Sequence, residues 1–356
     1  MNTSRDLKKD PLRVGWVGAG FVGQVAHLAN YVDIPEAKIV ALAELRPELG
    51  HKVAERYGIP RYYEDHKALL EDKDIEAVVV VVRRHHTASV ALDVLNAGFH
   101  TFTEKPMAAT LDQAERLVEA AKENDCLYAI GFMRRHDEGV QMAKQMLDEL
   151  RESGELGPVL YARFFCFFGG DYCNIGGFMP TDEPRPEHLI LPTAPDWMPE
   201  KLHLEYEHFL NVASHDLNLI RFLMGKRPQV PHVEYRQNEG SLAVLDFGDF
   251  PGVFEWGAID QNRWEEGVEI HFARGRLKIS LPPAFLRNQP ASVELYKDTG
   301  GDVGRFTVPR PDWTWSFKRQ HEAFINNVAT GTEPLASGFD AVEDMRFIED
   351  MWKKII

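Results

Sequence analysis

Two short stretches of the chain carry side chains whose types and spacing suit the handling of protons. Lys105, in Glu104-Lys105-Pro106, follows an apolar run, and a lysine there can donate a hydrogen bond and stabilise an oxyanion. His215 comes four residues after Asn211, so on a helix the two side chains share one face. Histidine titrates near neutrality and can act as a general base, while an amide can orient a hydroxyl group. We therefore predict Lys105, Asn211 and His215 as catalytic and substrate-binding residues, with a solvated lysine and a packed histidine as the structural alternatives.

Basic residues form two further groups, Arg83-Arg84-His85 and Arg134-Arg135-His136, each close behind an apolar run. Positive groups on loops at one edge of a sheet can attract cofactor phosphates or an anionic substrate. We predict cofactor contacts for Arg83, His85 and Arg134 and a substrate contact for Arg135. Salt bridges to the many carboxylates of the chain are the alternative.

A glycine-rich turn indicates where a dinucleotide would bind. An apolar run leads into Gly18-x-Gly20-x-x-Gly23, and a helical pattern begins at Phe21. The first glycine of such a motif permits a tight turn, the second lets the backbone approach a pyrophosphate, and the third lets the helix pack closely on the strand. The helix N-terminus offers N–H groups to the phosphates. We predict that this turn, with Phe21 and Val22, binds a dinucleotide; a glycine turn that binds nothing is the alternative.

The choice between the two nicotinamide dinucleotides depends on Glu44, which ends the next apolar run 21 residues beyond Gly23. An acidic side chain there accepts hydrogen bonds from the adenosine ribose and repels a 2′-phosphate. The sequence therefore predicts NAD rather than NADP, a preference that the nearby Arg46 weakens. Arg46, Glu104 and Lys105 are also expected among the cofactor contacts.

Short apolar runs alternate with helical patterns from residue 12 to about residue 131, which is typical of βαβ units on a parallel sheet. The expected strands are Leu12–Val17, Lys38–Ala43, Arg61–Tyr63, Ala77–Val82, His100–Thr103 and Leu127–Ile130. The expected helices are Phe21–Asn30, Pro47–Tyr57, His66–Glu71, Thr87–Asn96, Leu111–Asn124 and about Glu138–Ser153. We predict an α/β fold that begins with a doubly wound Rossmann sheet.

Strand-like segments dominate beyond Pro158, at 159–168 and from 230 to 308. They predict a C-terminal α+β domain with a large, open, mostly antiparallel sheet. Further helices are expected at about 211–224, 316–330 and 338–356.

We predict a dinucleotide-binding domain at 1–136 and a domain for substrate binding and oligomerisation at 137–356, whose last helix packs back on the first domain. A long loop at about 169–205 contains six prolines, and a loop of that length is usually functional or disordered. Aromatic faces suit the apolar sides of sugar rings, so Tyr172 and Trp197 are predicted to contact substrate; packing in a core or interface is the alternative.

The composition excludes several classes of protein. A formal charge of −15 over 356 residues argues against a nucleic-acid partner, because phosphate binding needs clustered Lys and Arg. No apolar run approaches 18 residues, so we expect no membrane span, and the polar N-terminus is unlike a signal peptide. Cys126, Cys166 and Cys173 lack metal-ligand spacing, which predicts reduced thiols, no metal and a cytoplasmic location.

Taken together, these features resemble the glucose–fructose oxidoreductase / inositol dehydrogenase / MocA (Gfo/Idh/MocA) family. The resemblance covers nearly the whole chain, through the glycine turn, Glu44, Glu104-Lys105-Pro106, Gly131-Phe-Met-Arg-Arg and the helix with His215. It implies a Rossmann domain plus an α/β domain whose open sheet often forms the oligomer interface, and hence a homo-oligomer, dimeric or tetrameric. It also implies pyridine-nucleotide-dependent oxidation or reduction of a sugar or cyclitol carbon, with Lys105 matching the catalytic lysine and His215 the catalytic histidine.

Two departures from the family pattern concern the chemistry. Asn211 stands where many members have an aspartate, and an amide cannot take a proton. Where many members read Thr-Pro-Asn, this chain has Val82-Arg83-Arg84-His85. The difference favours an unusual substrate, and anionic substrates are among the candidates.

The sequence thus predicts an NAD-dependent oxidoreductase acting on a secondary alcohol or ketone of a sugar, glycoside or cyclitol. The alternatives are an enzyme that retains NAD and cleaves glycosides by transient oxidation and elimination, and a non-catalytic NAD-binding regulatory protein.

Overall fold

The computed structural model describes residues 6–170, 172–184, 191–237, 240–260, 262–298 and 300–356. The chain forms two compact units. Unit 1 contains Met1–Phe132, Gly176–Asn211 and Phe317–Met345, and unit 2 contains Met133–Ile175, Val212–Ser316 and Arg346–Ile356. The compact units therefore assign two later segments, 176–211 and 317–345, to the N-terminal sheet, whereas the domain boundary at 136/137 stays a prediction.

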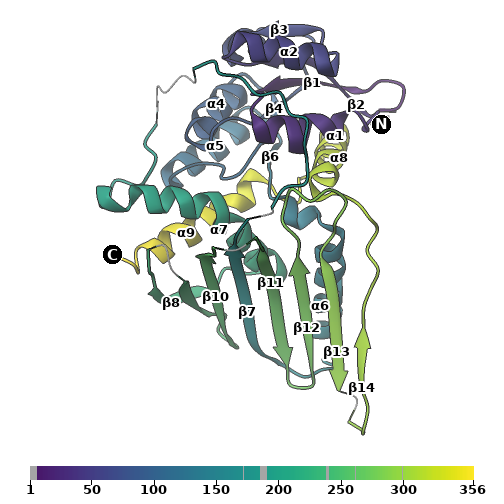
Figure 1. Ribbon diagram of the computed structural model, residues 1–356, viewed down its shortest axis with the longest axis vertical. Helices are drawn as coiled ribbons and strands as arrows, with labels where there is room; N and C mark the ends of the chain where they lie inside the picture. The colour runs from purple at the N-terminus through teal and green to yellow at the C-terminus, as the bar shows by residue number, and fades with distance from the viewer. Residues whose placement is uncertain (1–5, 171, 185–190, 238–239, 261, 299) are drawn as a thin grey trace. The chain divides into compact units, whose positions relative to one another are not determined.

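Within the described residues, unit 1 is built around a six-stranded parallel sheet in the order β3-β2-β1-β4-β5-β6 (Figure 1). Its strands are β1 (Leu12–Val17), β2 (Ala37–Ala43), β3 (Arg61–Tyr63), β4 (Ala77–Val80), β5 (His100–Thr103) and β6 (Tyr128–Ile130). Alternate residues of β4 enter different apolar cores: Val79 packs in the core that contains Trp16 and Phe102, and Val78 and Val80 pack in a second one. Both faces of the sheet are therefore covered, as a continuous apolar strand requires.

Local signals explain where several helices begin and end. α2 (Pro47–Tyr57) has proline in its first turn and ends at Gly58, whose φ is +63°. Thr110 caps α5 (Leu111–Glu123) by accepting a hydrogen bond from the N–H of Gln113 at 3.2 Å. The remaining helices that match the expected positions are α3 (His66–Leu70), α6 (Glu138–Ser153), α8 (Ser316–Thr330) and α9 (Gly338–Trp352), the last ending before Ile356.

The segment after the glycine turn differs from the α-helix predicted at Phe21–Asn30. It is a π-helix, η1 (Gly23–Leu28), followed by a short α1 (Ala29–Tyr31). Its polar side chains His27 and Asn30 are buried, because His27 contacts residues far away in the sequence and Asn30 donates to the carbonyl of Ala26 at 2.6 Å. Apolar periodicity could not predict this wider turn, which is typical of functional sites.

Two helices begin earlier than predicted. α4 spans Arg84–Asn96, so Arg84 and His85 lie in its first turn instead of a loop. α7 spans His203–Met224 and starts inside the long loop expected at 169–205, after the short 3-10 helix η3 (Glu200–Leu202). The start of α4 lacks the side-chain capping signal by which sequence reasoning locates helix ends, since Arg83 makes no cap hydrogen bond through its side chain.

Unit 2 holds a sheet of eight strands, counted over the described residues, in the order β14-β13-β12-β11-β7-β10-β9-β8. The strands are β7 (Val159–Phe168), β8 (Gln229–Glu234), β9 (Ser241–Asp246), β10 (Pro251–Ala258), β11 (Glu265–Phe272), β12 (Gly275–Leu281), β13 (Ser292–Asp298) and β14 (Gly304–Thr307). Strands β7 and β10 are parallel, and the other neighbours are antiparallel. The mostly antiparallel C-terminal sheet is thus confirmed.

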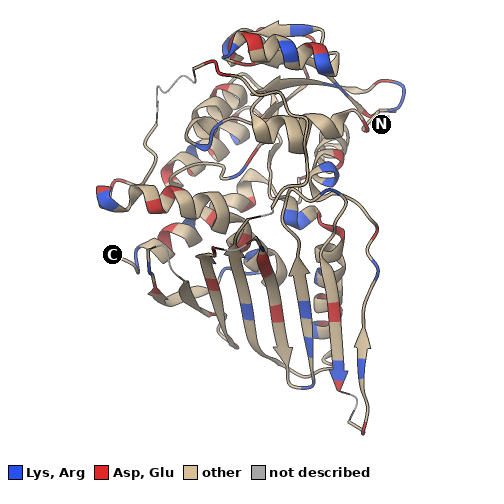
Figure 2. Cartoon of the chain, viewed as in Figure 1, with Lys and Arg blue, Asp and Glu red and all other residues tan. Residues whose placement is uncertain are grey.

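The two faces of this sheet differ in character. Along β7, Ala162, Phe164 and Cys166 are buried, whereas Arg163 between them is half-exposed and pairs with Glu255 of β10 at 2.5 Å. Further opposite charges meet between neighbouring strands β11 to β13, and Figure 2 shows them along the sheet. Helix α6 packs on β12 and β13. Among the described residues, no helix combines the length and the apolar character needed to cross a bilayer.

Candidate active site

The glycine turn has the shape that a dinucleotide requires. Gly18 has a φ of +96°, and a Cβ on it would lie 2.3 Å from the carbonyl oxygen of Val81. A Cβ on Gly23 would lie 3.1 Å from the carbonyl oxygen of Gly18, whereas a Cβ on Gly20 would meet nothing within 4 Å. The first and third glycines are therefore needed for packing, and the space in front of Gly20 is open. A pyrophosphate fits that space.

Glu44 lies beside the same turn, at the end of β2. Its buried carboxylate accepts a hydrogen bond from the N–H of Ala19 at 2.7 Å. Arg46 donates to it through Nε at 2.7 Å, through a terminal nitrogen at 3.1 Å and through its backbone N–H at 3.2 Å. This bidentate pair fixes the carboxylate in the position from which an acidic side chain binds ribose hydroxyls.

Glu104 directly follows strand β5, and its carboxylate contacts other residues of unit 1. One carboxylate oxygen lies 3.0 Å from Nε2 of His27, and the other accepts the N–H of Lys105 at 2.9 Å. A Cβ on Gly131 would lie 2.8 Å from Oε1 of Glu104, so the glycine of the Gly-Phe-Met-Arg-Arg stretch permits this close approach. The cofactor contact predicted for Glu104 stays a prediction, while its contacts within unit 1 position the backbone of Lys105.

Lys105 and Asn211, both predicted site residues, lie together in unit 1. The contact is made by the backbone carbonyl of Asn211 and not by its side chain. The ammonium of Lys105 donates to the backbone carbonyl of Asn211 at 2.5 Å, and the side chain of Asn211 is exposed. Lys105 itself is half-buried. The lysine is thus anchored to helix α7 through a main-chain oxygen.

His215 follows Asn211 by four residues on the continuous helix α7, and it is half-buried. It belongs to the part of α7 that is assigned to unit 2. Its neighbour Asp216 is buried. Asn218, on the face that Asn211 and His215 were predicted to share, is buried and accepts a hydrogen bond from Arg135 at 2.8 Å.

The basic residues after β4 surround an acid that sequence reasoning missed. Glu207 of α7 lies 3.8 Å from a terminal nitrogen of Arg84 and 3.6 Å from Nδ1 of His85, while Arg83 is exposed. Burial lowers the pKa of His85, and it outweighs the opposing effect of the Glu207 carboxylate. His85 is therefore neutral near pH 7 and can accept or donate a hydrogen bond.

The second basic group lies inside unit 2, in the 3-10 helix η2 (Met133–His136). Arg134 is 3% exposed and forms an ion pair with Glu266. Arg135 is 4% exposed, donates to Asn218 and stacks over the ring of Phe222 at 5.3 Å. The ion pair of Arg134 favours the salt-bridge alternative for that residue, whereas Arg135 has an amide and an aromatic ring as partners. Their predicted contacts with cofactor and substrate stay predictions.

The aromatic residues of the long segment divide between the units. Tyr172 is 46% exposed and lies near the rings of Trp264 and Phe285 in unit 2. Trp197 is 37% exposed in unit 1, where Phe178 packs edge-on against Phe21 of the glycine turn with ring centroids 5.0 Å apart. Part of the predicted loop therefore lies on the cofactor-binding part of unit 1.

Remote partners of the candidate residues could not be found from local patterns. His27 contacts both Glu104 and His321, and Gln24 hydrogen-bonds the backbone of Met179, 155 residues away. Within the described part of the chain, no group of three or more His, Cys, Asp or Glu could hold a metal ion. Burial raises the pKa of Cys126 to about 11 and that of Cys166 well above its usual value, so neither thiol is activated.

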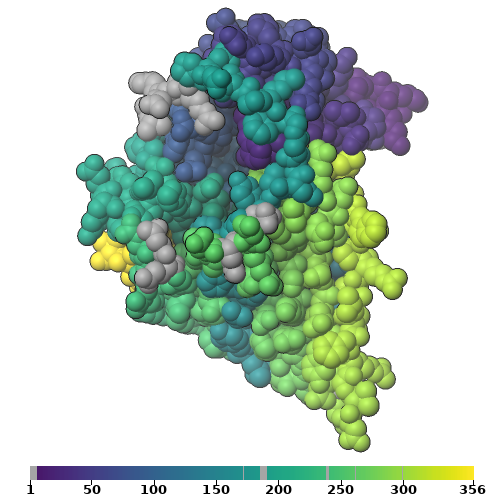
Figure 3. All heavy atoms as spheres, viewed as in Figure 1, coloured from purple at the N-terminus to yellow at the C-terminus, as the bar shows by residue number. Residues whose placement is uncertain are grey.

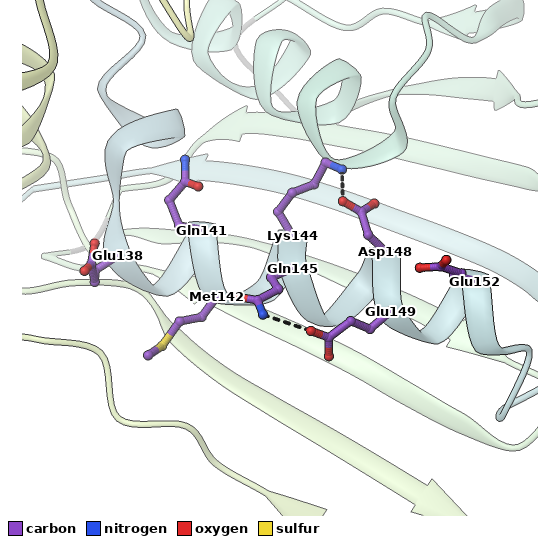
Figure 4. A pocket seen from close by; sticks show the side chains of 8 residues that line it. All are labelled: Glu138, Gln141, Met142, Lys144, Gln145, Asp148, Glu149 and Glu152. Carbon is purple, nitrogen blue, oxygen red and sulfur yellow. Dashed lines mark hydrogen bonds and ion pairs between the residues drawn. The ribbon is translucent and has the colours of Figure 1, made fainter.

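The pocket drawn in Figure 4 lies along one face of α6, and its lining contains none of the predicted site residues. Its lining consists of Glu138, Gln141, Met142, Lys144, Gln145, Asp148, Glu149 and Glu152. Lys144 pairs with Asp148, and Gln145 donates to Glu149 at 2.8 Å. Such i,i+4 pairs stabilise an exposed helix, and we assign no chemistry to this pocket.

Comparison with known proteins agrees with this geometry. The family described as "Oxidoreductase family, NAD-binding Rossmann fold" (GFO_IDH_MocA) matches residues 12–132. Myo-inositol 2-dehydrogenase of Thermotoga maritima is 25% identical over 350 residues, 92% of each chain. Inositol 2-dehydrogenase of Salmonella paratyphi B is 35% identical over 153 residues, which are 42% of this chain and 44% of that protein.

Among solved structures, levoglucosan dehydrogenase in complex with NADH and levoglucosan superimposes with a TM-score of 0.75 at 18% identity, over 97% of each chain. That likeness concerns the fold. Residues 12–132 thus match the Rossmann unit of the Gfo/Idh/MocA oxidoreductases, the family that the sequence resembles. The predicted resemblance to this family, the fold class, the NAD-binding Rossmann unit and the oxidoreductase class are confirmed.

Proposed function

We propose that this protein is an NAD-dependent dehydrogenase that acts on a secondary alcohol of a cyclitol, sugar or glycoside. The observation that carries the proposal is the open space before Gly20 next to the fixed carboxylate of Glu44, with Lys105 held at the end of β5 in the same parallel sheet. Relatives named for inositol and levoglucosan support a polyhydroxylated ring as the substrate class. The carboxyl ends of parallel strands are where such sheets bind their ligands.

We assign the protein's own chemistry to three side chains. His215 takes the hydroxyl proton of the substrate as a general base, and Lys105 donates a hydrogen bond to the developing alkoxide. Asn211, which cannot take a proton, orients a substrate hydroxyl. When bound, the nicotinamide supplies the hydride acceptor. Lys105 can turn from the Asn211 carbonyl to the substrate oxygen because its stem is flexible.

The central test combines a substrate screen with a variant of the proposed base. Purified protein is mixed with NAD or NADP and with inositols, hexoses, uronates, levoglucosan and simple glycosides, and reduced nicotinamide is followed by absorbance. The variant His215→Ala should lose about 10²–10⁴-fold in kcat while NAD still binds. The control is His208→Ala, an exposed histidine on the same helix, which should leave kcat within about twofold.

Two outcomes would overturn the proposal. One is the absence of dinucleotide binding by the unmodified protein, measured by calorimetry. The other is full turnover in His215→Ala, which would remove the general base. The predicted homo-oligomer and the cytoplasmic location stay predictions.

A further inference from the structure

A segment from the middle of the chain lies over the dinucleotide-binding part of unit 1. We call residues 176–183 the strap. The ring of Phe178 packs on Phe21, and Met179 is held through its backbone by the Gln24 side chain, which accepts its N–H at 2.7 Å and donates to its carbonyl at 3.1 Å. In Figure 3 teal atoms of this part of the chain rest on the purple and blue atoms of unit 1. The strap is therefore part of the surface that a dinucleotide would meet.

The last residue of the strap, Glu183, has its carboxylate at the start of helix α2. The two oxygens of Glu183 accept the N–H groups of Glu48 and Leu49 at 3.0 and 2.9 Å, and the hydroxyl of Thr181 donates at 2.9 Å. Partial burial acts to raise the pKa of Glu183, but the two backbone hydrogen bonds, Thr181 and the charge of Arg46 together lower it. Glu183 is thus a fixed negative charge where a helix N-terminus would otherwise attract an anion.

This helix start lies beside the position that distinguishes the two nicotinamide dinucleotides. Glu44 occupies the position of the acid that binds the adenosine ribose hydroxyls. Arg46, two residues later, is the N-cap residue of α2 and pairs with Glu44. In enzymes that use NADP, an arginine near this acid binds the 2′-phosphate. Here Arg46 is already held by the fork to Glu44 and faces the charge of Glu183. Two carboxylates therefore surround one guanidinium, and the local charge is negative.

We propose that Glu183 determines cofactor specificity by filling, from a remote segment of the chain, the anion position that the 2′-phosphate of NADP would need. Glu183 excludes the phosphate in two ways: it occupies the two N–H groups at the start of α2, and its charge neutralises Arg46 together with Glu44. This inference rests on the proposed dinucleotide site and adds a second acid to the one that the sequence pattern identifies.

The test measures binding of two small probes by calorimetry, without any turnover. 5′-AMP reports the adenosine and 5′-phosphate site, and 2′,5′-ADP is the same molecule with an added 2′-phosphate. The unmodified protein should bind 5′-AMP at least tenfold more tightly than 2′,5′-ADP. Glu183→Gln, which keeps a side-chain oxygen but removes the charge, should improve the Kd of 2′,5′-ADP about tenfold and change that of 5′-AMP by less than about threefold. Glu183→Ala, which also frees the N–H groups, should improve it further.

The matched control is Glu48→Gln, in the first turn of the same helix. Glu48 is exposed and pairs with Lys52 at 3.8 Å, so the substitution removes the same charge without freeing the site. If Glu48→Gln improves the 2′,5′-ADP Kd as much as Glu183→Gln, or if neither Glu183 variant changes it, the inference is wrong. Equal affinity of the unmodified protein for both probes would also contradict it, with the proposed function intact. Absence of 5′-AMP and NAD binding by the unmodified protein would overturn both.

Discussion

Lys105 and His215, two of the predicted catalytic residues, are each next in the sequence to a buried carboxyl group. The two carboxyl groups have different surroundings. Glu104, before Lys105, belongs to a histidine cluster with His27, His321 and Tyr31 in unit 1. Asp216, after His215, belongs to an arginine cluster in unit 2. The members of the arginine cluster are Arg134, Glu266, Asp216, Cys166 and Trp264.

Hydrogen bonds in the histidine cluster join His27, His321 and Tyr31: Nδ1 of His27 lies 2.7 Å from Nε2 of His321, and Nδ1 of His321 lies 3.3 Å from the hydroxyl of Tyr31. The other ring nitrogen of His27, Nε2, lies 3.0 Å from the Glu104 carboxylate. Burial raises the pKa of Tyr31 well above its usual range, so the hydroxyl is neutral. Imidazole can donate at one nitrogen and accept at the other, which lets such a chain satisfy a carboxylate with little additional charge.

The arginine cluster contains two carboxyl groups for one guanidinium. Arg134 pairs with Glu266, to which Trp264 also donates a hydrogen bond at 2.9 Å. Burial and the charge of Glu266 raise the pKa of Asp216 well above its usual value, and Arg134 offsets only part of this. Unit 1 therefore places its buried acid between an imidazole and a backbone N–H group, whereas unit 2 holds its acids by charge balance and protonation.

Removal of the central cation should have the largest effect on stability. Arg134→Met leaves Glu266 buried without its counter-charge and should lower the free energy of unfolding by about 3–5 kcal/mol. Urea denaturation measures this. Arg163→Met is the control: Arg163 pairs with Glu255 on the half-exposed face of β7, with side chains 38% and 28% exposed, and the expected loss is about 0–1 kcal/mol. Equal losses for the two variants would show that charge balance in the arginine cluster is unimportant.

A smaller loss is expected in the histidine cluster. His321→Leu removes the hydrogen bonds to His27 and Tyr31 and should cost about 1–3 kcal/mol in thermal or urea unfolding. Tyr31→Phe deletes only the longer bond at the end of the chain and should cost about 0.5–1.5 kcal/mol. If Tyr31→Phe is as damaging as His321→Leu, the hydrogen-bond chain does not explain how Glu104 is held.

A last prediction concerns the pH dependence of stability. The pKa of Asp216 is higher in the folded than in the unfolded chain, so its favourable contribution is present below pH of about 4 and is lost progressively as the pH rises. Asp216→Asn should remove this pH-dependent loss of stability, which is at most about 1.4 kcal/mol per pH unit. Plots of the free energy of unfolding against pH should therefore diverge above pH of about 4 between the variant and the unmodified protein. Urea unfolding between pH 4 and 8 measures the divergence. Asp249→Asn, at a residue with a side chain 90% exposed, should give a curve parallel to the original, and a parallel curve for Asp216→Asn would contradict the prediction.

Much of unit 1 could be predicted because its signals are local. The strands at Leu12–Val17 and Arg61–Tyr63 and the helix at Pro47–Tyr57 have the predicted bounds, since apolar runs, turn glycines and a first-turn proline act within a few residues. The π-helix after the glycine turn and the early starts of α4 and α7 were not predicted. These ends depend on tertiary contacts or lack a capping side chain.

The sequence by itself determined the glycine turn, the acid that follows it and the resemblance of the Rossmann unit to its family, because these depend on spacing along one strand–turn–helix segment. Tertiary structure alone decided which partners those residues have. His27 and His321 are 294 residues apart, Arg134 and Glu266 are 132 apart, and Glu183 caps a helix 135 residues before it. Such contacts leave no periodic trace in the chain, since side chains that meet only after folding impose no rule on their neighbours in sequence. The candidate specificity residue Glu183 is therefore visible only in the folded protein.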